Sequence, residues 1–213
     1  SGRNDSFLTS KDGKINLISV TTPRDTALIG VSGDGTKAWG WYYIPPPETK
    51  LLSQAFILDN GVANKINPFN ANQSSVQGAS DNTDTYWGIY LDSNNITKNF
   101  IYKNGQFTDV TFTDAVHSPV VYVNGISGIS ADESDVKGIS GDGTTLYGSY
   151  KDANSKLNAF LYKNGSRTVI NPPNSQSASI QKVSKDGSVA VGNFVKPNGD
   201  NGAFIYKNGT STE

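Results

Sequence analysis

The chain has 213 residues, and its 18 basic and 19 acidic side chains nearly cancel, which argues against nucleic acid as a partner. It contains no cysteine, so disulfide frameworks, cysteine-ligated zinc and thiol nucleophiles are excluded. It also has no run of about 18 apolar residues, so we expect no membrane insertion by this segment.

The composition favours an all-β protein with many turns. Only 35% of the residues are hydrophobic, whereas 22 are glycine, as expected where short strands alternate with tight turns. The 10 tyrosines, 9 phenylalanines and 3 tryptophans supply enough apolar area for a folded core. Because methionine is absent even at the first position, we expect the chain to be a piece of a longer protein.

A hairpin pattern recurs along the chain, with a phenylalanine, an apolar residue and usually a tyrosine placed shortly before Asn-Gly. Its copies are Ser6–Gly13 in a looser form, Ala55–Gly61, Asn99–Gly105, Ala159–Gly165 and Ala203–Gly209. Asn-Gly favours a two-residue hairpin turn, because both residues tolerate positive φ there. The Phe and Tyr side chains share one face of the predicted strand and the Ala and Ile side chains share the other. Since both faces are apolar, we expect each strand to be covered on both sides.

A second pattern alternates with the first. It combines a Gly-x-Ser segment, a polar turn that is usually Asp-Gly, and an aromatic-Gly-x-aromatic segment. Its copies are Gly30–Tyr42, a degenerate Gly78–Tyr90, Gly138–Tyr150 and Val183–Phe194. The glycine between the aromatic residues is expected to leave room for a bulky side chain from a neighbouring sheet.

Together the two patterns predict four strands per repeat of about 45 residues, the last being a stretch such as Val62 to Ile66. That is the size of a propeller blade, and a blade with two apolar faces must stack on others. We therefore predict a single β-propeller-like repeat domain over residues 1–213, either whole or cut from a longer array. About five four-stranded blades are expected, with four as the alternative. The stretch from Val120 to Asp132 resembles both patterns in shortened form and predicts an extra hairpin or a collapsed blade.

These motifs resemble a bacterial extracellular repeat family named for its His-Ala-Phe signature (HAF-type repeats). The corresponding triplets are Gln54–Phe56, Lys98–Phe100, Asn158–Phe160 and Gly202–Phe204, so the histidine is never kept. The Ser-x-Asp-Gly turn and the Phe-x-Tyr-x-Asn-Gly hairpin do match. The resemblance implies a secreted or surface-displayed bacterial protein with propeller-like blades, and it brings no catalytic residues.

Candidate catalytic and metal-binding residues have simpler structural interpretations. The single histidine, His117, has no evident partner, and no Gly-x-Ser-x-Gly elbow accompanies it. The turn at Ser32–Gly35 is similar to the Asp-box of sialidase propellers, but an aspartate in such a turn accepts backbone hydrogen bonds. Asp132, Glu133 and Asp135 offer oxygen ligands for calcium, although an acidic solvated loop is the simpler interpretation. We predict no metal and no cofactor.

The tryptophans Trp39, Trp41 and Trp87 are the predicted ligand-binding residues, since exposed aromatic rings stack on sugars and on protein side chains. The alternative is that they pack between blades. We expect a non-enzymatic binding or adhesion module outside the cell or on its surface, with a protein or glycan as the partner. A sialidase-like propeller glycosidase and a purely structural repeat spacer are the alternatives.

Overall fold

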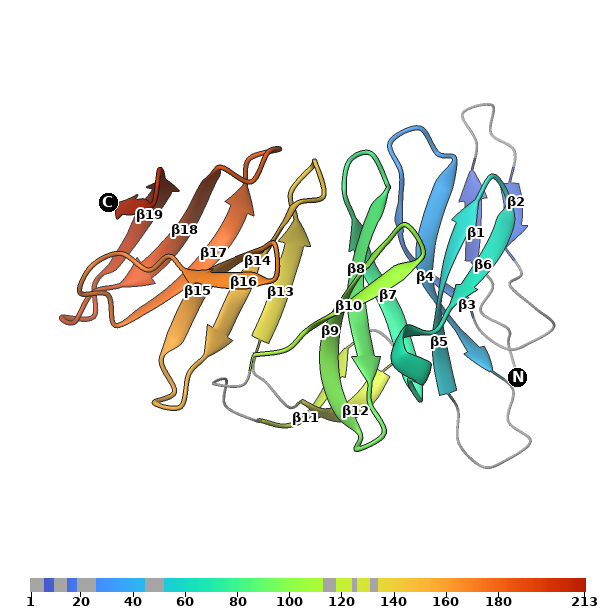
Figure 1. Cartoon of the computed structure of the whole chain (residues 1–213), viewed down its shortest axis with the longest axis horizontal. Helices are drawn as coiled ribbons and strands as arrows, with labels where there is room; N and C mark the ends of the chain where they lie inside the picture. Colours follow the sequence, from blue (N-terminus) through green and yellow to red (C-terminus); the bar gives the residue numbers. More distant parts are fainter. Residues whose placement is uncertain are drawn as a thin grey trace. The chain divides into compact units, whose positions relative to one another are not determined.

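A computed structural model describes residues 6–9, 15–18, 26–44, 52–112, 118–123, 126–130 and 134–213. Within these ranges the chain is built of strands, joined by tight turns and one short 3-10 helix, η1 (Pro68–Asn70) (Figure 1). No helix in this described part is long and apolar enough to cross a membrane. His117, Asp132, Glu133 and the proline run at 45–47 lie outside the described residues.

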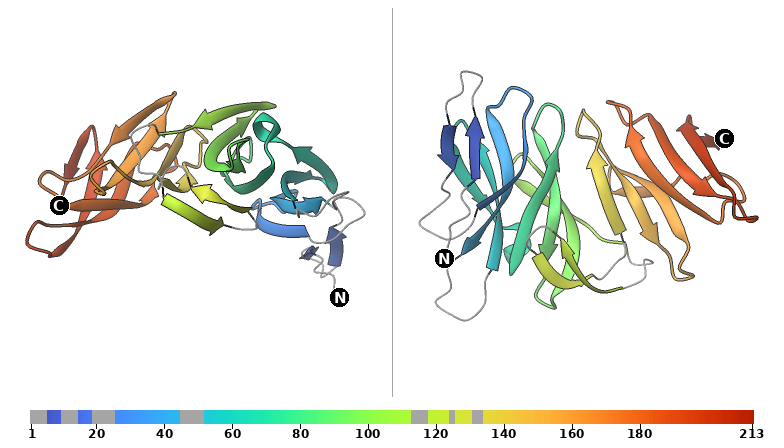
Figure 2. Two further views of the ribbon diagram at one scale, coloured as in Figure 1. Left: turned by 90° about the horizontal axis from the view of Figure 1, so that it is seen from below. Right: turned by 180° about the vertical axis from the view of Figure 1, so that it is seen from behind.

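Four sheets share one architecture, in which four antiparallel strands follow one another in sequence order (Figure 2). The first contains β3 (Thr26–Val31), β4 (Lys37–Ile44), β5 (Leu52–Asp59) and β6 (Val62–Ile66). The second contains β7 (Gln73–Ala79), β8 (Thr85–Leu91), β9 (Ile96–Lys103) and β10 (Gln106–Val110). The third contains β13 (Ser134–Ile139), β14 (Thr145–Lys151), β15 (Leu157–Lys163) and β16 (Ser166–Val169). The fourth contains β17 (Ser177–Val183), β18 (Val189–Val195), β19 (Asn201–Lys207) and β20 (Thr210–Thr212).

Two shorter hairpins complete the described strands. β1 (Ser6–Thr9) pairs with β2 (Ile15–Ile18), which is the looser hairpin copy of the sequence. β11 (Ser118–Val123) pairs with β12 (Ile126–Ser130), and β12 joins the second sheet next to β9. Of the two interpretations of this stretch, an extra hairpin is therefore the one observed.

The described chain divides into two compact units. One is built mainly from β1–β12, and the other from β13–β20 with the turn Ala79–Thr85 and the residues from Asp109 to Phe112.

The Asn-Gly hairpins form as predicted, because both turn residues adopt positive φ. Asn164 and Gly165, for example, have φ of 52° and 79°, and the other three Asn-Gly turns have similar values. The strand predicted from Val62 to Ile66 is β6. The turns therefore set the register in which the third and fourth strands of each sheet pair.

Each four-stranded sheet carries the same buried aromatic pair. The phenylalanine of the third strand meets, edge-on or tilted, the aromatic residue two positions after the second strand's glycine, with centroids 6.1 Å apart for Tyr150 and Phe160. The other pairs are Tyr42–Phe56, Tyr90–Phe100 and Phe194–Phe204. All four phenylalanines are almost completely buried. Their burial confirms that this face of each sheet belongs to the core.

The glycine between the aromatic residues has a different role from the one expected. A Cβ on Gly192 would lie 2.3 Å from the Ser179 carbonyl oxygen and 2.5 Å from the Phe204 ring. Both groups belong to neighbouring strands of the same sheet, so the expectation of a side chain from another sheet was wrong. Gly88 is crowded in the same way by Ser75 and Phe100. The glycine thus leaves room for the Ser179 carbonyl and the Phe204 ring beside the irregularity in β17, where the register with β18 shifts between Ile180 and Lys182.

Candidate binding surfaces

Trp39 lies inside the first unit, between two sheets. It is 8% exposed, and its ring meets Tyr86 of the second sheet edge-on, with centroids 5.9 Å apart. Its other neighbour is Gly30 of β3, where a Cβ would come within 2.4 Å of the indole. This residue therefore packs between sheets.

Trp41 and Tyr43 form a partly exposed aromatic pair farther along β4. Their rings meet edge-on, with centroids 4.9 Å apart. Trp41 is opposite Ala55 and Tyr43 is opposite Ser53 in the register of β4 and β5, so both neighbours on β5 are small. Both rings keep partial exposure. Of the three predicted tryptophans, Trp41 is the one placed beside a second partly exposed ring.

Trp87 is also partly exposed, but its indole lies over Gly78, where a Cβ would come within 2.5 Å of Nε1. Tyr147 covers Gly138 in the same way in the third sheet. Across three sheets, an aromatic side chain of the second strand thus covers a glycine of the first. The sequence indicates this contact through the glycine of its Gly-x-Ser segments, because any larger residue at that position would collide with the ring.

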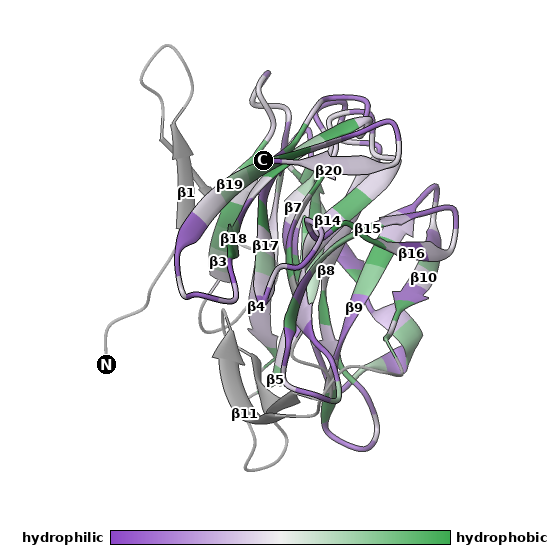
Figure 3. Ribbon diagram, turned by 90° about the vertical axis from the view of Figure 1, so that its left-hand side faces the viewer, coloured by the Kyte–Doolittle hydropathy of each residue, from purple (hydrophilic) through white to green (hydrophobic). Residues whose placement is uncertain are grey.

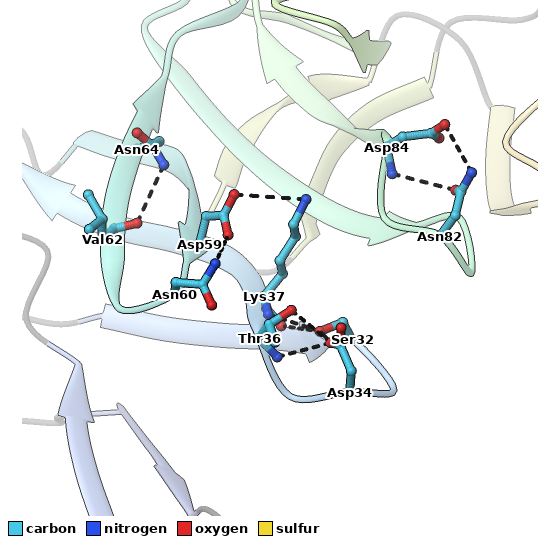
Figure 4. Close-up of polar contacts among 10 residues, drawn as sticks. All are labelled: Ser32, Asp34, Thr36, Lys37, Asp59, Asn60, Val62, Asn64, Asn82 and Asp84. Atoms are coloured by element: carbon cyan, nitrogen blue, oxygen red, sulfur yellow. Dashed lines mark hydrogen bonds and ion pairs between the residues drawn. The ribbon is translucent and has the colours of Figure 1, made fainter.

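In the Ser-x-Asp turns, groups of the same turn donate hydrogen bonds to the aspartate carboxylate. The Ser184 hydroxyl donates to Asp186 Oδ1 at 2.6 Å, and the amide and hydroxyl of Ser188 donate to the same oxygen at 3.1 and 2.8 Å. Figure 4 shows the equivalent set, in which Asp34 accepts from Ser32 and Thr36. These donors, the serine hydroxyl first, lower the pKa of Asp34 and of Asp186 from 3.8 to about 2.

The second sheet varies this turn. Asn82 replaces the aspartate and accepts from the Ser80 hydroxyl at 2.6 Å. The Asn82 amide donates to Asp84 at 2.9 Å, as Figure 4 shows. A neutral amide thus serves in the place of a carboxylate, as expected if the residue stabilises the turn. Within the described residues, no three His, Asp or Glu side chains gather as a metal-binding group.

Within the second unit, the Ser-x-Asp turns are also bonded to one another, which sequence patterns did not predict. The Asp81 amide donates to the Gly141 carbonyl at 3.0 Å, and the Asp142 amide donates to the Lys185 carbonyl at 2.8 Å. Gly187 packs on Thr145, where a Cβ would lie 2.3 Å from Oγ1. Successive turns are therefore joined through their backbones at one end of the sheets.

One face of the fourth sheet has exposed apolar residues on its two middle strands, and we call it the β18–β19 face. Val191 and Ile205 are 41% and 51% exposed there, whereas the equivalent Tyr147 and Leu161 of the third sheet are each 8% exposed. Green apolar segments lie along β18 and β19 in Figure 3. A hollow of about 320 Å³ adjoins these residues, and it is lined by Gln181, Val191, Gly192, Asn193, Ala203, Phe204, Ile205 and Glu213.

The third and fourth sheets of the second unit differ in what covers them. Tyr147, Ala159 and Leu161 of the third sheet share a core cluster with Ala178 and Ile180 of β17. The fourth sheet thus covers the third, and no described strand of the second unit covers the fourth at the equivalent position.

No family model matches this sequence, and no curated protein matches it. Among solved structures, the whole chain aligns with 74% of a protein of Agrobacterium tumefaciens assigned as TolB, at a TM-score of 0.52 and 11% identity. TolB from Acinetobacter baumannii aligns with 97% of the chain over 50% of its own length, at 0.46 and 11% identity. The β-propeller domain of the Trilobed protease from Pyrococcus furiosus aligns with 98% of the chain over 75% of its own, at 0.39 and 9% identity.

The repeated four-stranded antiparallel sheets and the first of these similarities show an all-β fold of the β-propeller type. The number of blades and the repeat length of about 45 residues stay predictions.

Proposed function

We propose that this protein is a non-enzymatic binding module displayed outside the cell or on its surface, and that it takes a protein or glycan ligand at Trp41 and Tyr43. The observation that carries the proposal is the partly exposed edge-on pair of these two rings. Aromatic faces of this kind stack on sugar rings and on the apolar side chains of a partner at little cost in conformational entropy.

The absence of catalysis in this proposal is supported by the Ser-x-Asp turns. The carboxylates of Asp34 and Asp186 are each occupied by three hydrogen bonds within their own turns. Their lowered pKa keeps them ionised, which suits an acceptor in a turn and not the proton donor of a glycosidase. Location outside the cell and membership of the HAF-type repeats belong to the same proposal, and they are supported by the turn and hairpin motifs.

The test combines binding with turnover. The purified chain, its Trp41→Ala variant and a control variant are applied to an oligosaccharide array and to immobilised extracellular matrix proteins. We expect the chain to bind at least one of these probes, and Trp41→Ala to lower the affinity by about tenfold or more, as for a central aromatic contact. Val169→Ala is the control, because Val169 is an exposed apolar residue of β16 in the other compact unit.

A fluorogenic sialoside is incubated with the same samples, and no turnover above the buffer blank is expected. Turnover that follows the protein through purification would overturn the non-enzymatic proposal. Binding that Trp41→Ala leaves unchanged would overturn the assignment of the ligand surface.

A further inference from the structure

Phe69, in the connection between β6 and β7, combines an unusual backbone conformation with an exposed ring. Its φ of 51° and ψ of 30° lie in the left-handed region, which a bulky side chain rarely adopts. The connection from β16 to β17 has the same length and the same Ile-Asn-Pro start, but it has Pro173 at this position, where the proline ring fixes φ at about −65°. The connection therefore does not require a positive φ, yet it presents a phenylalanine that is 47% exposed. Strain of this kind at an exposed residue marks a candidate functional site.

The ring of Phe69 packs on the second sheet, on the face that is turned towards the first sheet. Its centroid lies 5.1 Å from that of Tyr90 and 5.9 Å from that of Phe107. Tyr90 shares its face of β8 with Tyr86, and the Tyr86 ring meets Trp39 of the first sheet. All five residues belong to the first unit, so the ring contacts of Phe69 lie within one unit.

The third sheet repeats this aromatic pair and adds a cation to it. Phe112 and Tyr150 are tilted by 46° with centroids 5.8 Å apart, close to the 44° and 5.1 Å of Phe69 and Tyr90. The guanidinium of Arg167 lies over both rings, 4.6 Å from the centroid of Phe112 and 4.0 Å from that of Tyr150. Both distances are within the reach of about 6 Å that is typical of a cation–π contact. Phe112, with the guanidinium over it, is only 5% exposed.

The second sheet has another aromatic ring where the third sheet has its arginine. Phe107 is the second residue after an Asn-Gly turn, which is the place of Arg167 in the third sheet. Within the described part of the chain, no lysine or arginine side chain lies over Phe69 or Phe107. The first and fourth sheets also place a cation over the residue that corresponds to Tyr150. These contacts are Lys65–Tyr42 at 5.5 Å and Lys196–Phe194 at 5.8 Å.

We infer that Phe69 binds an arginine side chain of a partner protein, whose guanidinium stacks on the exposed ring beside Phe107. The chain makes this contact within itself in the third sheet, on a ring pair of similar geometry. Arginine suits the site better than lysine, because its planar guanidinium stacks on aromatic faces and is more weakly hydrated. Phe69 is nearly half exposed, whereas small molecules bind in concave sites that bury most of their surface. An arginine carried by a protein needs no such cavity. The site contains neither Trp41 nor Tyr43, so it does not rest on the proposed function.

An N-acetylated and amidated Gly-Arg-Gly peptide tests this inference beside its citrulline counterpart, which has nearly the same shape but no charge. In ¹⁵N NMR titrations of the purified chain, we expect the arginine peptide to shift the amide signals of Phe69 and Asn70 saturably. The citrulline peptide should bind at least about threefold more weakly, which is the size of an exposed cation–π contact. A lysine peptide should fall between the two. Equal binding of the arginine and citrulline peptides, or no saturable shift with either, would overturn the inference.

Two variants locate the contact. Phe69→Leu keeps an apolar side chain but removes the ring, and it should lower the affinity for the arginine peptide by about threefold or more. Val62→Ala is the matched control and should leave the affinity unchanged, because Val62 is an exposed apolar residue of the same unit. Phe107→Arg should supply a guanidinium from within the chain, as Arg167 does in the third sheet, and so compete with the peptide. Full affinity in Phe69→Leu or in Phe107→Arg would show that the peptide binds elsewhere.

Discussion

The amide of Asp142 donates a hydrogen bond of 2.8 Å to the carbonyl of Lys185, which joins the Ser-x-Asp turn of the third sheet to that of the fourth. These two turns are thereby stabilised in two ways. The serine and aspartate are hydrogen-bonded within each turn, and a backbone hydrogen bond joins one turn to the other. The turns contribute to the packing of sheet on sheet, in addition to reversing the chain.

Replacement of Gly187 by alanine should be destabilising for two reasons. Its φ of +68° disfavours a residue with a Cβ, by about 1–2 kcal/mol, and that Cβ would lie 2.3 Å from Thr145 Oγ1 of the neighbouring sheet. Gly209 is the matched control, because its φ is +81° but a Cβ there meets nothing within 4 Å. In urea unfolding, Gly187→Ala should lose more stability than Gly209→Ala. Equal losses would show that the turn does not pack closely on Thr145.

Acid titration should single out the turn aspartates. The pKa of Asp186 is lowered from 3.8 to about 2, with the Ser184 hydroxyl as the largest cause. A carboxyl whose pKa falls on folding stabilises the fold at pH values above its ordinary pKa, and that contribution is lost as the pH falls through the range from about 4 to about 2. Carboxyl ¹³C NMR should give this low value, and Ser184→Ala should raise it towards 3.8. A pKa that stays near 2 in the variant would mean that the Ser184 hydroxyl is not the main cause of the lowered pKa.

Truncation of Phe160 should be costly, because its ring is completely buried against Tyr150 and Phe112, with the Phe112 centroid 4.8 Å away. We expect Phe160→Ala to lower the free energy of unfolding by about 3–5 kcal/mol through the cavity it leaves. Phe100→Ala should behave alike in the second sheet. Losses below about 1 kcal/mol at both positions, measured by urea unfolding, would place these rings at the surface.

The strands and hairpins were predictable because their causes are local. The Asn-Gly dipeptide at Asn164 forms the same turn as in the other three hairpins. The neighbours Phe160 and Leu161 alternate along their strand, so their side chains lie on opposite faces. The aspartates of the Ser-x-Asp turns could likewise be interpreted as structural from their own sequence. These features depend on neighbours within a few residues.

The environment of each face was not predictable, because it depends on another sheet. Trp39 and Trp41 share one face of β4, yet Trp39 packs on Tyr86 of the second sheet while Trp41 stays partly exposed. Leu161 and Ile205 hold the same place in their repeats and differ only in what covers them. Leu161 and Ile205 follow the same hairpin pattern, so that pattern contains no signal for the difference.

The comparison of Leu161→Ala with Ile205→Ala tests most directly the claim that successive sheets bury one another's faces. In urea unfolding of the monomer, Leu161→Ala should cost about 2–5 kcal/mol, because the fourth sheet covers Leu161, whereas Ile205→Ala should stay within about 0.5–1 kcal/mol. Similar losses at the two positions, or a larger loss at Ile205, would contradict the stacking of these sheets.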